Sequence, residues 1–345
     1  MAVYTVIEQH DLAELVADYG LNRLIGAHGI AAGSVNSNYL LETGRGKHLL
    51  RIDEVKSELD LKRELELLIF LGKNGFPCPQ PIADRKGRWY REAAGKWLSL
   101  YRWAEGHSVK PERLTLAHLE NAGRALAELH SIGKAYKKAI DNRFSFERIS
   151  ARWAEIRDGL PSYFRRILRT LDDEVDFLGH YLENKLPKGV IHGDCFHDNL
   201  LFKGDKVTAL LDFEAACRGK FIFDLATGVN ALCFARDGYH LRRFEALIAG
   251  YESLRALSLA EWDAFPNELR FSALRFTVTR LSDFVLKPVD RGARVPKDFR
   301  EFYERLRILR REREGGMEGL LMAMATGYDY RKYQRVKALE KKGSK

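Results

Sequence analysis

The sequence predicts an α+β protein, with an antiparallel sheet and one inserted helix in its first part and a mostly helical second part. Two patterns support this prediction. Between residues 24 and 52, three short runs of strand-forming residues are separated by turns that contain glycine. From Thr115 to His130, apolar residues recur every three or four positions, which is the spacing of one helix face. We therefore divide the chain into a first lobe, 1–103, and a second lobe, 104–345.

The first lobe is expected to open with a helix from Asp11, a favourable N-cap residue, to Gly20. Another helix is expected over residues 57–73, where leucines repeat at helical intervals before Gly75. Three prolines between residues 77 and 81 favour an extended segment after that helix. The strands of this lobe are expected near 24–30, 37–42, 47–52, 89–91 and 97–103.

The second lobe begins where the character of the chain changes, at Ala104-Glu105-Gly106. Its helical pattern is interrupted once, between Gly189 and Phe213, where the residues indicate a strand, a loop, a second strand, a turn and a third strand. This interruption also carries the most informative polar residues of the sequence.

The composition is that of an ordinary globular chain, with 46% hydrophobic and 30% charged residues among 345. No apolar stretch reaches the roughly 18 residues that span a bilayer, and the start lacks a secretory pattern, so we expect a cytoplasmic protein without membrane contact. The four cysteines form no CxxC pair and are expected to be free thiols. The net charge is +9, but the basic run from Arg331 to Lys345 lacks any nucleic-acid motif and is interpreted as a solvated end.

The polar residues between Val190 and Phe213 fit phosphoryl transfer to a hydroxyl. That reaction needs a carboxylate that orients the hydroxyl and receives its proton, and oxygen ligands that hold Mg²⁺ against the phosphates. Asp194 suits the first role. Asn199 and Asp212 suit the second, because Mg²⁺ prefers carboxylate and amide oxygens. His192 is expected to orient the loop by hydrogen bonding.

His192-Gly193-Asp194-x-x-x-x-Asn199 followed by Leu211-Asp212-Phe213 resembles the Brenner motif of the aminoglycoside phosphotransferase and choline kinase-like superfamily. The resemblance covers roughly residues 25–290. It implies a protein-kinase-like two-lobed fold, ATP and Mg²⁺ as cofactors, and a small molecule with a hydroxyl as acceptor. It also implies that Arg51 binds phosphate and pairs with Glu64, and that Asp224 supports the catalytic loop, a role compatible with capping the helix that follows.

Nucleotide binding would have to proceed without a GxGxxG loop, which the sequence lacks. Backbone N–H groups and side-chain amides between Gly29 and Asn38 would cover the phosphates instead. The resemblance places the adenine-binding hinge at Tyr101 and Trp103. The candidate nucleotide-binding residues are therefore Gly33, Ser34, Asn36, Asn38, Arg51, Glu64, Tyr101 and Trp103.

The chain is most similar to the bacterial homoserine kinase branch of this fold. The similarity is carried by Gly29-Ile30-Ala31, Asn36-Ser37-Asn38-Tyr39, Cys78-Pro79-Gln80-Pro81 and the stretch from Arg275 to Leu281. It implies phosphorylation of the hydroxyl of L-homoserine, a step toward threonine. Three features depart from that branch: Gly193 replaces its usual Ala, Glu214 replaces its usual Tyr, and the chain continues through residues 317–345.

The charges of the expected acceptor suggest which residues could bind it. Homoserine is a zwitterion, so its site needs a cation and an acid, and Arg280 and Asp283 could supply both or simply pair with each other. The substrate candidates are His197, Glu214, Arg275, Arg280 and Asp283. Two other interpretations stay open: a kinase of a choline-like or ethanolamine-like alcohol or of an aminoglycoside, and a catalytically silent protein that binds a nucleotide or a partner.

Overall fold

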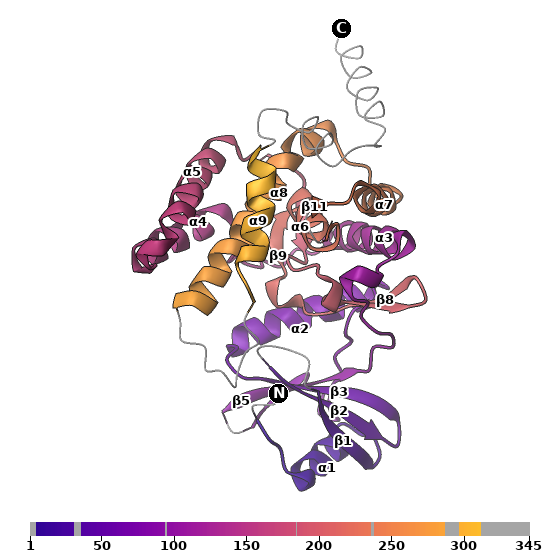
Figure 1. The fold of residues 1–345 in the computed structure, drawn as a ribbon. Helices are drawn as coiled ribbons and strands as arrows, with labels where there is room; N and C mark the ends of the chain where they lie inside the picture. Colours follow the sequence, from indigo (N-terminus) through magenta and orange to yellow (C-terminus); the bar gives the residue numbers. More distant parts are fainter. Residues whose placement is uncertain are drawn as a thin grey trace. The chain divides into compact units, whose positions relative to one another are not determined.

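The computed structural model describes residues 5–30, 36–93, 95–183, 185–235, 238–286 and 297–311 (Figure 1). These residues form two compact units. The first unit comprises the described residues of Met1–Gly106 and Thr208–Glu214. The second comprises those of His107–Val207, Ala215–Lys287 and Lys297–Lys345.

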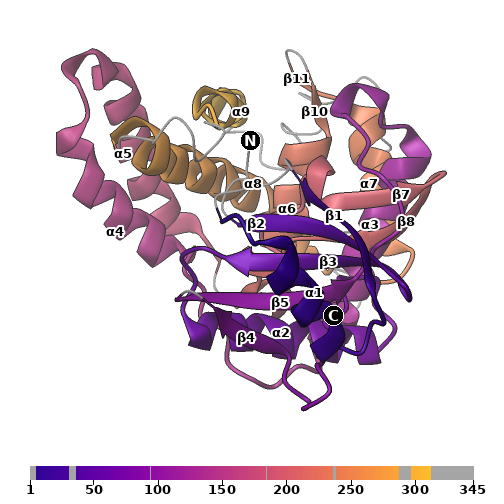
Figure 2. The ribbon, with the colours of Figure 1, turned by 90° about the horizontal axis from the view of Figure 1, so that it is seen from below.

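The first unit is built on a five-stranded antiparallel sheet. Its strands are β1 (Leu24–Ile30), β2 (Ser37–Thr43), β3 (Gly46–Asp53), β4 (Tyr90–Ala93) and β5 (Lys96–Arg102), in the spatial order β1-β2-β3-β5-β4 (Figure 2). The β2–β3 turn uses Gly46 with a φ of 101°, a conformation that favours glycine. Because β3 lies in the middle of the sheet, its side chains have neighbours on both sides.

The two faces of this sheet differ in chemistry. Side chains alternate along a strand, so Leu50 and Ile52 of β3 join an apolar cluster with helix α1 (Gln9–Asp18). Arg51 points to the opposite face, where it contacts Glu64 of helix α2 (Glu58–Lys73). The sheet therefore carries a hydrophobic layer on one side and charged groups on the other.

The predicted elements of this unit are confirmed, with small shifts at their ends. Helix α1 begins two residues before Asp11, so that Asp11 lies in its first turn and Glu8 occupies the N-cap position. Helix α2 has a true side-chain cap, because the Ser57 hydroxyl accepts the Asp60 N–H at 3.2 Å. Strand β5 ends at Arg102, so Trp103 lies just beyond it.

The second unit is mostly helical. Its helices are α3 (Leu116–Gly133), α4 (Phe146–Ile156), α5 (Arg165–Tyr181), α6 (Phe221–Leu232), α7 (Leu241–Glu252), α8 (Leu259–Arg280) and α9 (Arg300–Arg311). Its short strands are β6 (Lys188–Ile191), which pairs antiparallel with β9 (Cys217–Lys220), and β7 (Leu200–Lys203), β10 (Phe234–Ala235) and β11 (Gly238–Tyr239). Strand β8 (Lys206–Leu210) lies where the chain passes into the first unit.

Helix α6 forms the centre of the second unit. All twelve of its residues are buried, and it packs against α8 and α3. An apolar helix with every side covered is typical of a protein core. Asp224, in its first turn, is therefore held in a rigid and water-poor environment.

Helices α3 and α7 lie side by side and approach each other through glycines (Figure 1). A Cβ atom built on Gly123 would come within 1.9 Å of the Leu247 carbonyl oxygen of α7. Conversely, a Cβ atom on Gly250 would come within 1.8 Å of the Glu120 carbonyl oxygen of α3. Only glycine at both positions allows the two backbones to come this close.

Two further features concern the whole described chain. Among the residues that the structure describes, no helix is both long and apolar enough to cross a membrane. The four cysteines all lie in described ranges, and each is a buried free thiol.

Candidate active site

Arg51 is held on β3 by a partner from the next helix. Its Nη1 lies 2.8 Å from Oε1 of Glu64, and both side chains are largely buried. The ion pair expected between these two residues is therefore present. The guanidinium also lies 6.0 Å from the centre of the Tyr101 ring, which is itself 1% exposed.

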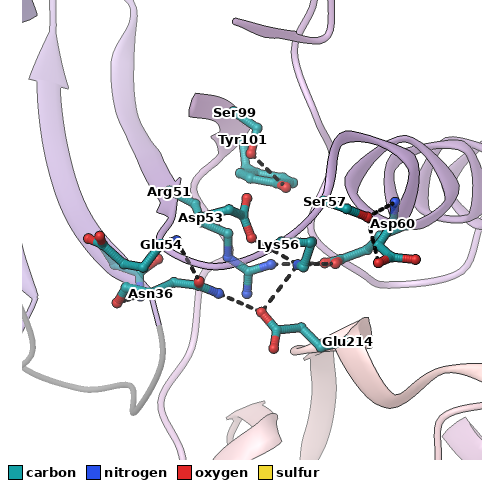
Figure 3. A network of polar contacts seen from close by, with 12 residues as sticks. Asn36, Arg51, Asp53, Glu54, Lys56, Ser57, Asp60, Ser99, Tyr101 and Glu214 are labelled. Atoms are coloured by element: carbon teal, nitrogen blue, oxygen red, sulfur yellow. Dashed lines mark hydrogen bonds and ion pairs between the residues drawn. The ribbon is translucent and has the colours of Figure 1, made fainter. Parts of the chain in front are cut away.

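Lys56 is a second cation at the same place, and no pattern in the sequence singles it out. Its Nζ lies 2.6 Å from Oε2 of Glu64, 2.9 Å from Oδ1 of Asp53 and 3.2 Å from Oε1 of Glu214 (Figure 3). Burial alone would lower the pKa of this ammonium, but the surrounding carboxylates outweigh burial and raise it. Lys56 follows β3 by three residues, and in sequence it looks like an ordinary surface lysine.

Glu214 belongs to the same network rather than standing apart as a substrate ligand. Its Oε1 accepts a hydrogen bond from Asn36 Nδ2 at 2.5 Å, in addition to the contact with Lys56 (Figure 3). Burial would raise the pKa of the Glu214 carboxyl, but Arg51 and Lys56 lower it to about 2. The carboxylate is therefore charged, and it links the segment after β8 to the start of β2.

Asp212 lies two residues before Glu214, in an unusual backbone conformation. Its φ is 59°, in the left-handed region that residues other than glycine rarely adopt. The flanking chain is anchored within the first unit: the Leu210 N–H donates to the Pro77 carbonyl at 2.9 Å, and the Phe213 ring meets the Phe76 ring edge-on at 6.4 Å. Backbone strain that the surroundings maintain is frequent at functional sites.

The loop between β6 and β7, in the second unit, carries Asp194 and Asn199. Asn199 Nδ2 donates to the Asp194 carbonyl at 2.8 Å and lies 3.4 Å from the carboxylate oxygen Oδ2. The Asp194 N–H donates to Nδ1 of His192 at 3.2 Å, and His192 is completely buried. The structure thus brings the three predicted loop residues together, with His192 in contact with the backbone of the loop.

Asp224 holds the backbone of this loop through two hydrogen bonds. Its Oδ2 accepts the His192 N–H at 2.8 Å, and its Oδ1 accepts the Gly193 N–H at 2.7 Å. Burial would raise the pKa of the Asp224 carboxyl, but its hydrogen bonds with His130 and the loop outweigh burial and lower the pKa. A charged acceptor makes stronger bonds to the amides than a neutral one would.

A line of buried side chains continues from Asp224 through α3 and α7. His130 Nε2 lies 3.0 Å from Asp224 Oδ2, and His130 Nδ1 lies 2.7 Å from the Tyr251 hydroxyl. Arg255 donates to that hydroxyl at 2.9 Å and to Glu261 at 2.6 Å. Burial lowers the pKa of His130, although Asp224 opposes this effect. A neutral imidazole with its proton on Nε2 satisfies both of its neighbours.

Sequence reasoning assigned a role to Asp224 but none to His130, Tyr251 or Arg255. The apolar spacing from Thr115 to His130 predicts a helix but indicates no partner for the histidine. Tyr251 is 121 positions away from it, so no local spacing connects the two. A histidine at the end of a helical pattern is the only signal that the sequence offers.

Arg275, a predicted substrate residue, contacts the catalytic loop instead. It is 3% exposed, donates to the Gly193 carbonyl, and lies 3.9 Å from the centre of the Phe144 ring and 4.2 Å from that of Phe276. Burial lowers the pKa of its guanidinium to about 10, although Asp194 acts in the opposite direction. These contacts suit a residue that holds the loop in place.

Arg280 and Asp283 pair with different partners and not with each other. Arg280 donates to the Asp298 carbonyl at 2.6 Å and to Glu301 at 2.8 Å, whereas Asp283 pairs with Arg152. The reason is that α8 ends at Arg280, and residues Leu281–Leu286 form a wider π-helical turn. The three-residue spacing of an α-helix therefore does not apply there.

The other predicted residues have more varied positions. His197 begins the short 3₁₀ turn His197–Asn199 and is half-buried. Asn38 lies on β2 opposite Arg51 of β3, and Trp103 is half-buried after β5. Cys195 is fully buried, and burial raises the pKa of its thiol, which keeps it protonated. Gly33, Ser34 and the basic run from Arg331 lie outside the described residues.

Each unit carries part of the predicted set of site residues. The loop of the second unit presents a carboxylate, Asp194, beside an amide whose nitrogen faces that carboxylate, so the amide oxygen of Asn199 is directed away and is available to a cation. The first unit presents Asp212 and the cations Arg51 and Lys56. Oxygen donors of this kind fit a hard cation such as Mg²⁺. Within the described ranges, no group of three or more His, Cys, Asp or Glu side chains forms a metal cluster.

Comparison with known proteins agrees with this chemistry. The profile of a family described as "Phosphotransferase enzyme family" matches residues 26–257. A homoserine kinase of Methylobacterium radiotolerans is 39% identical over 324 residues, which are 91% of this chain and 98% of that protein. A homoserine kinase of Parvibaculum lavamentivorans is 38% identical over 90% of this chain and 96% of that protein.

Solved structures show the fold. An amicoumacin kinase in complex with AMP-PNP and Ca²⁺ matches with a TM-score of 0.67 and 17% identity, over 89% of this chain and 94% of that one. A choline/ethanolamine kinase family protein from Mesorhizobium loti matches with a TM-score of 0.60 and 18% identity, over 88% and 93%. The kinase-like α+β fold is thereby confirmed. Together with the family profile and the relatives at 38–39% identity, it shows that the chain belongs to the phosphotransferase enzyme family.

Proposed function

We propose that this protein is a cytoplasmic, Mg²⁺-dependent kinase that transfers the γ-phosphoryl group of ATP to the side-chain hydroxyl of L-homoserine, a step toward threonine. The observation that supports L-homoserine as the substrate is the similarity to homoserine kinases, which extends over at least nine-tenths of this chain at 38–39% identity. The geometry of the loop that carries Asp194 supports the reaction type.

Asp194 would orient the acceptor hydroxyl and receive its proton. Asn199 steadies the carboxylate through Oδ2, which leaves the other oxygen, Oδ1, for the hydroxyl. Phosphoryl transfer through a loose transition state depends mainly on positioning, so a rigid loop matters more than a strongly basic carboxylate. The contacts that Asp224 and Arg275 make with the loop fit this requirement.

Asn199 and Asp212 would hold Mg²⁺, which, when bound, offsets the negative charge on the phosphate oxygens. Arg51 would bind phosphate from β3. Asn36 and Asn38, with Gly33 and Ser34 before them in the sequence, would cover the phosphates. The backbone near Tyr101 and Trp103 would bind adenine.

The candidate substrate residues differ in whether their side chains already have partners in the described chain. Four of the five substrate candidates have structural partners: Glu214 binds Lys56 and Asn36, Arg275 binds the loop, and Arg280 and Asp283 pair with Glu301 and Arg152. We therefore retain His197, half-buried at the start of its 3₁₀ turn, as the candidate for substrate contact.

The test is Mg²⁺-dependent ADP release with a panel of acceptors: L-homoserine, L-serine, L-threonine, choline, ethanolamine and an aminoglycoside. The Asp194→Asn variant would be assayed in parallel. Asp176→Asn, at an exposed carboxylate on α5, is the matched control. We expect turnover on homoserine alone, lost in Asp194→Asn and retained in the control. Turnover on another acceptor would refute the substrate, and the absence of both turnover and nucleotide binding would refute the kinase.

A further inference from the structure

The ammonium group of Lys56 is enclosed by three carboxylates from three segments of the first unit. Asp53 ends β3, Glu64 lies on α2, and Glu214 follows β8, and all three lie within 3.2 Å of Nζ. Figure 3 shows Asp53 and Glu214 beside Lys56. The side chain of Lys56 is only 13% exposed. Two of these contacts, with Glu64 and Glu214, are hydrogen bonds, and the third, with Asp53, is an ion pair.

The guanidinium of Arg51 has hydrogen-bond donors that are not engaged by the carboxylates. It contacts Glu64 through Nη1 at 2.8 Å, and its buried Nε has no hydrogen-bond partner among the described residues. A guanidinium has five N–H donors in a planar fork that matches phosphate oxygens. Arg51 therefore keeps donors for an anionic ligand, whereas the charge of Lys56 is matched by the three carboxylates around it.

The charges of this network also depend on Lys56. Three carboxylates, those of Asp53, Glu64 and Glu214, face two cations. Without Lys56, Arg51 alone would face all three, and both Glu64 and Glu214 would compete with a phosphate for its donors. A group of uncompensated carboxylates repels a polyphosphate strongly in a partly buried site.

We propose that Lys56 is a positioning residue for the nucleotide: it neutralises Glu64 and Glu214 and so leaves the guanidinium of Arg51 to bind phosphate. Lys56 thus neutralises the carboxylates, and Arg51 contacts the ligand. The inference rests on the proposed function, because it takes a nucleoside triphosphate as the ligand. It assigns Glu214 to the nucleotide side of the reaction and not to the acceptor.

The experiment measures binding of Mg²⁺-AMP-PNP by isothermal titration calorimetry, which needs no acceptor. In Lys56→Met we expect the dissociation constant to rise about tenfold or more, because Glu64 and Glu214 then engage Arg51. Lys47→Met removes an exposed lysine of β3 and should leave the constant unchanged. Steady-state assays should show a larger change in the KM for ATP than in kcat.

The double variant Lys56→Met/Glu214→Gln separates this role from a direct contact. Removing the carboxylate that Lys56 neutralises should restore binding to within about threefold of wild type, on the same charge argument. If Lys56 itself bound phosphate, removing Glu214 would restore nothing, and that result would overturn the inference. A purely structural role would lower the melting temperature of Lys56→Met without changing the dissociation constant, and would overturn it as well.

Glu214→Gln alone keeps the test decisive even if Lys56→Met fails to fold. This nearly isosteric change should bind the nucleotide at least as tightly as wild type and leave the KM for homoserine unchanged. A raised KM for homoserine with unchanged nucleotide binding would place Glu214 at the acceptor and overturn the inference alone. If the wild-type protein bound no nucleotide, the inference and the proposed function would both be overturned.

Discussion

Replacing Tyr251 by Phe removes one hydroxyl from the line of hydrogen bonds that ends at the catalytic loop. That hydroxyl lies 2.7 Å from His130 Nδ1 and accepts from Arg255 at 2.9 Å, and both Tyr251 and His130 are 0% exposed. A buried polar group left without its partner costs about 1–3 kcal/mol. Arg255 keeps Glu261 at 2.6 Å, so the loss falls mainly on His130. We expect the free energy of unfolding to decrease by about 1–3 kcal/mol.

Turnover should also change, because His130 contacts Asp224, the residue that holds the loop. Without the Tyr251 hydroxyl, the imidazole is no longer fixed in the orientation that points Nε2 toward Asp224. Asp224 in turn holds the N–H groups of His192 and Gly193. We expect kcat to fall by about tenfold, which corresponds to about 1.4 kcal/mol of barrier, with the KM for ATP within about twofold of wild type.

The assay is ADP release at saturating ATP and homoserine, with urea unfolding measured on the same preparations. Tyr239→Phe is the matched control, because its hydroxyl donates to Asn230 within the second unit and does not belong to the line that reaches the loop. The control should lose stability but keep its kcat. If Tyr251→Phe lost only stability as well, the line from Tyr251 to Asp224 would not position the loop.

Three further predictions address stability and reactivity. Arg270→Met breaks a buried bidentate pair with Glu174, at 2.8 and 2.7 Å, and should cost about 3–5 kcal/mol in urea unfolding; a loss below about 1 kcal/mol would contradict this. The pKa of Glu214 is lowered from 4.5 to about 2, so its stabilising effect is complete above pH 4.5 and is lost as the pH falls toward 2. Between pH 4.5 and 2, the free energy of unfolding should therefore fall less in Glu214→Gln than in wild type. Equal losses would show that the Glu214 carboxylate does not cause this pH dependence. Burial raises the pKa of the Cys78 and Cys217 thiols to about 12, and all four cysteines are buried, so native protein should react with Ellman's reagent only after denaturation.

The features that the sequence predicted well depend on local patterns. Glycine turns and alternating apolar residues defined the strands around Arg51, and the spacing of Asp194 and Asn199 defined a loop whose side chains do meet. Strand and turn preferences act over a few residues, so one sequence is enough to recognise them.

The features that were missed depend on contacts between distant segments. Lys56 contacts Glu214, 158 positions away, and His130 contacts Tyr251, 121 positions away. The roles of both residues depend on these distant partners. Arg280 and Asp283 were placed on one face because the helix was assumed to continue, but a π-helical turn begins between them. No local pattern in a single sequence encodes either kind of information.

The paired glycines of α3 and α7 bear on how genetic variation in this protein should be interpreted. Gly250 directly precedes Tyr251, and a side chain at Gly250 or Gly123 would force the two helices apart and withdraw Tyr251 from His130. A substitution there would impair turnover although neither glycine has any functional group. In a mutational survey these two positions would score like active-site residues, and the distance between α7 and α3 would be the property under selection.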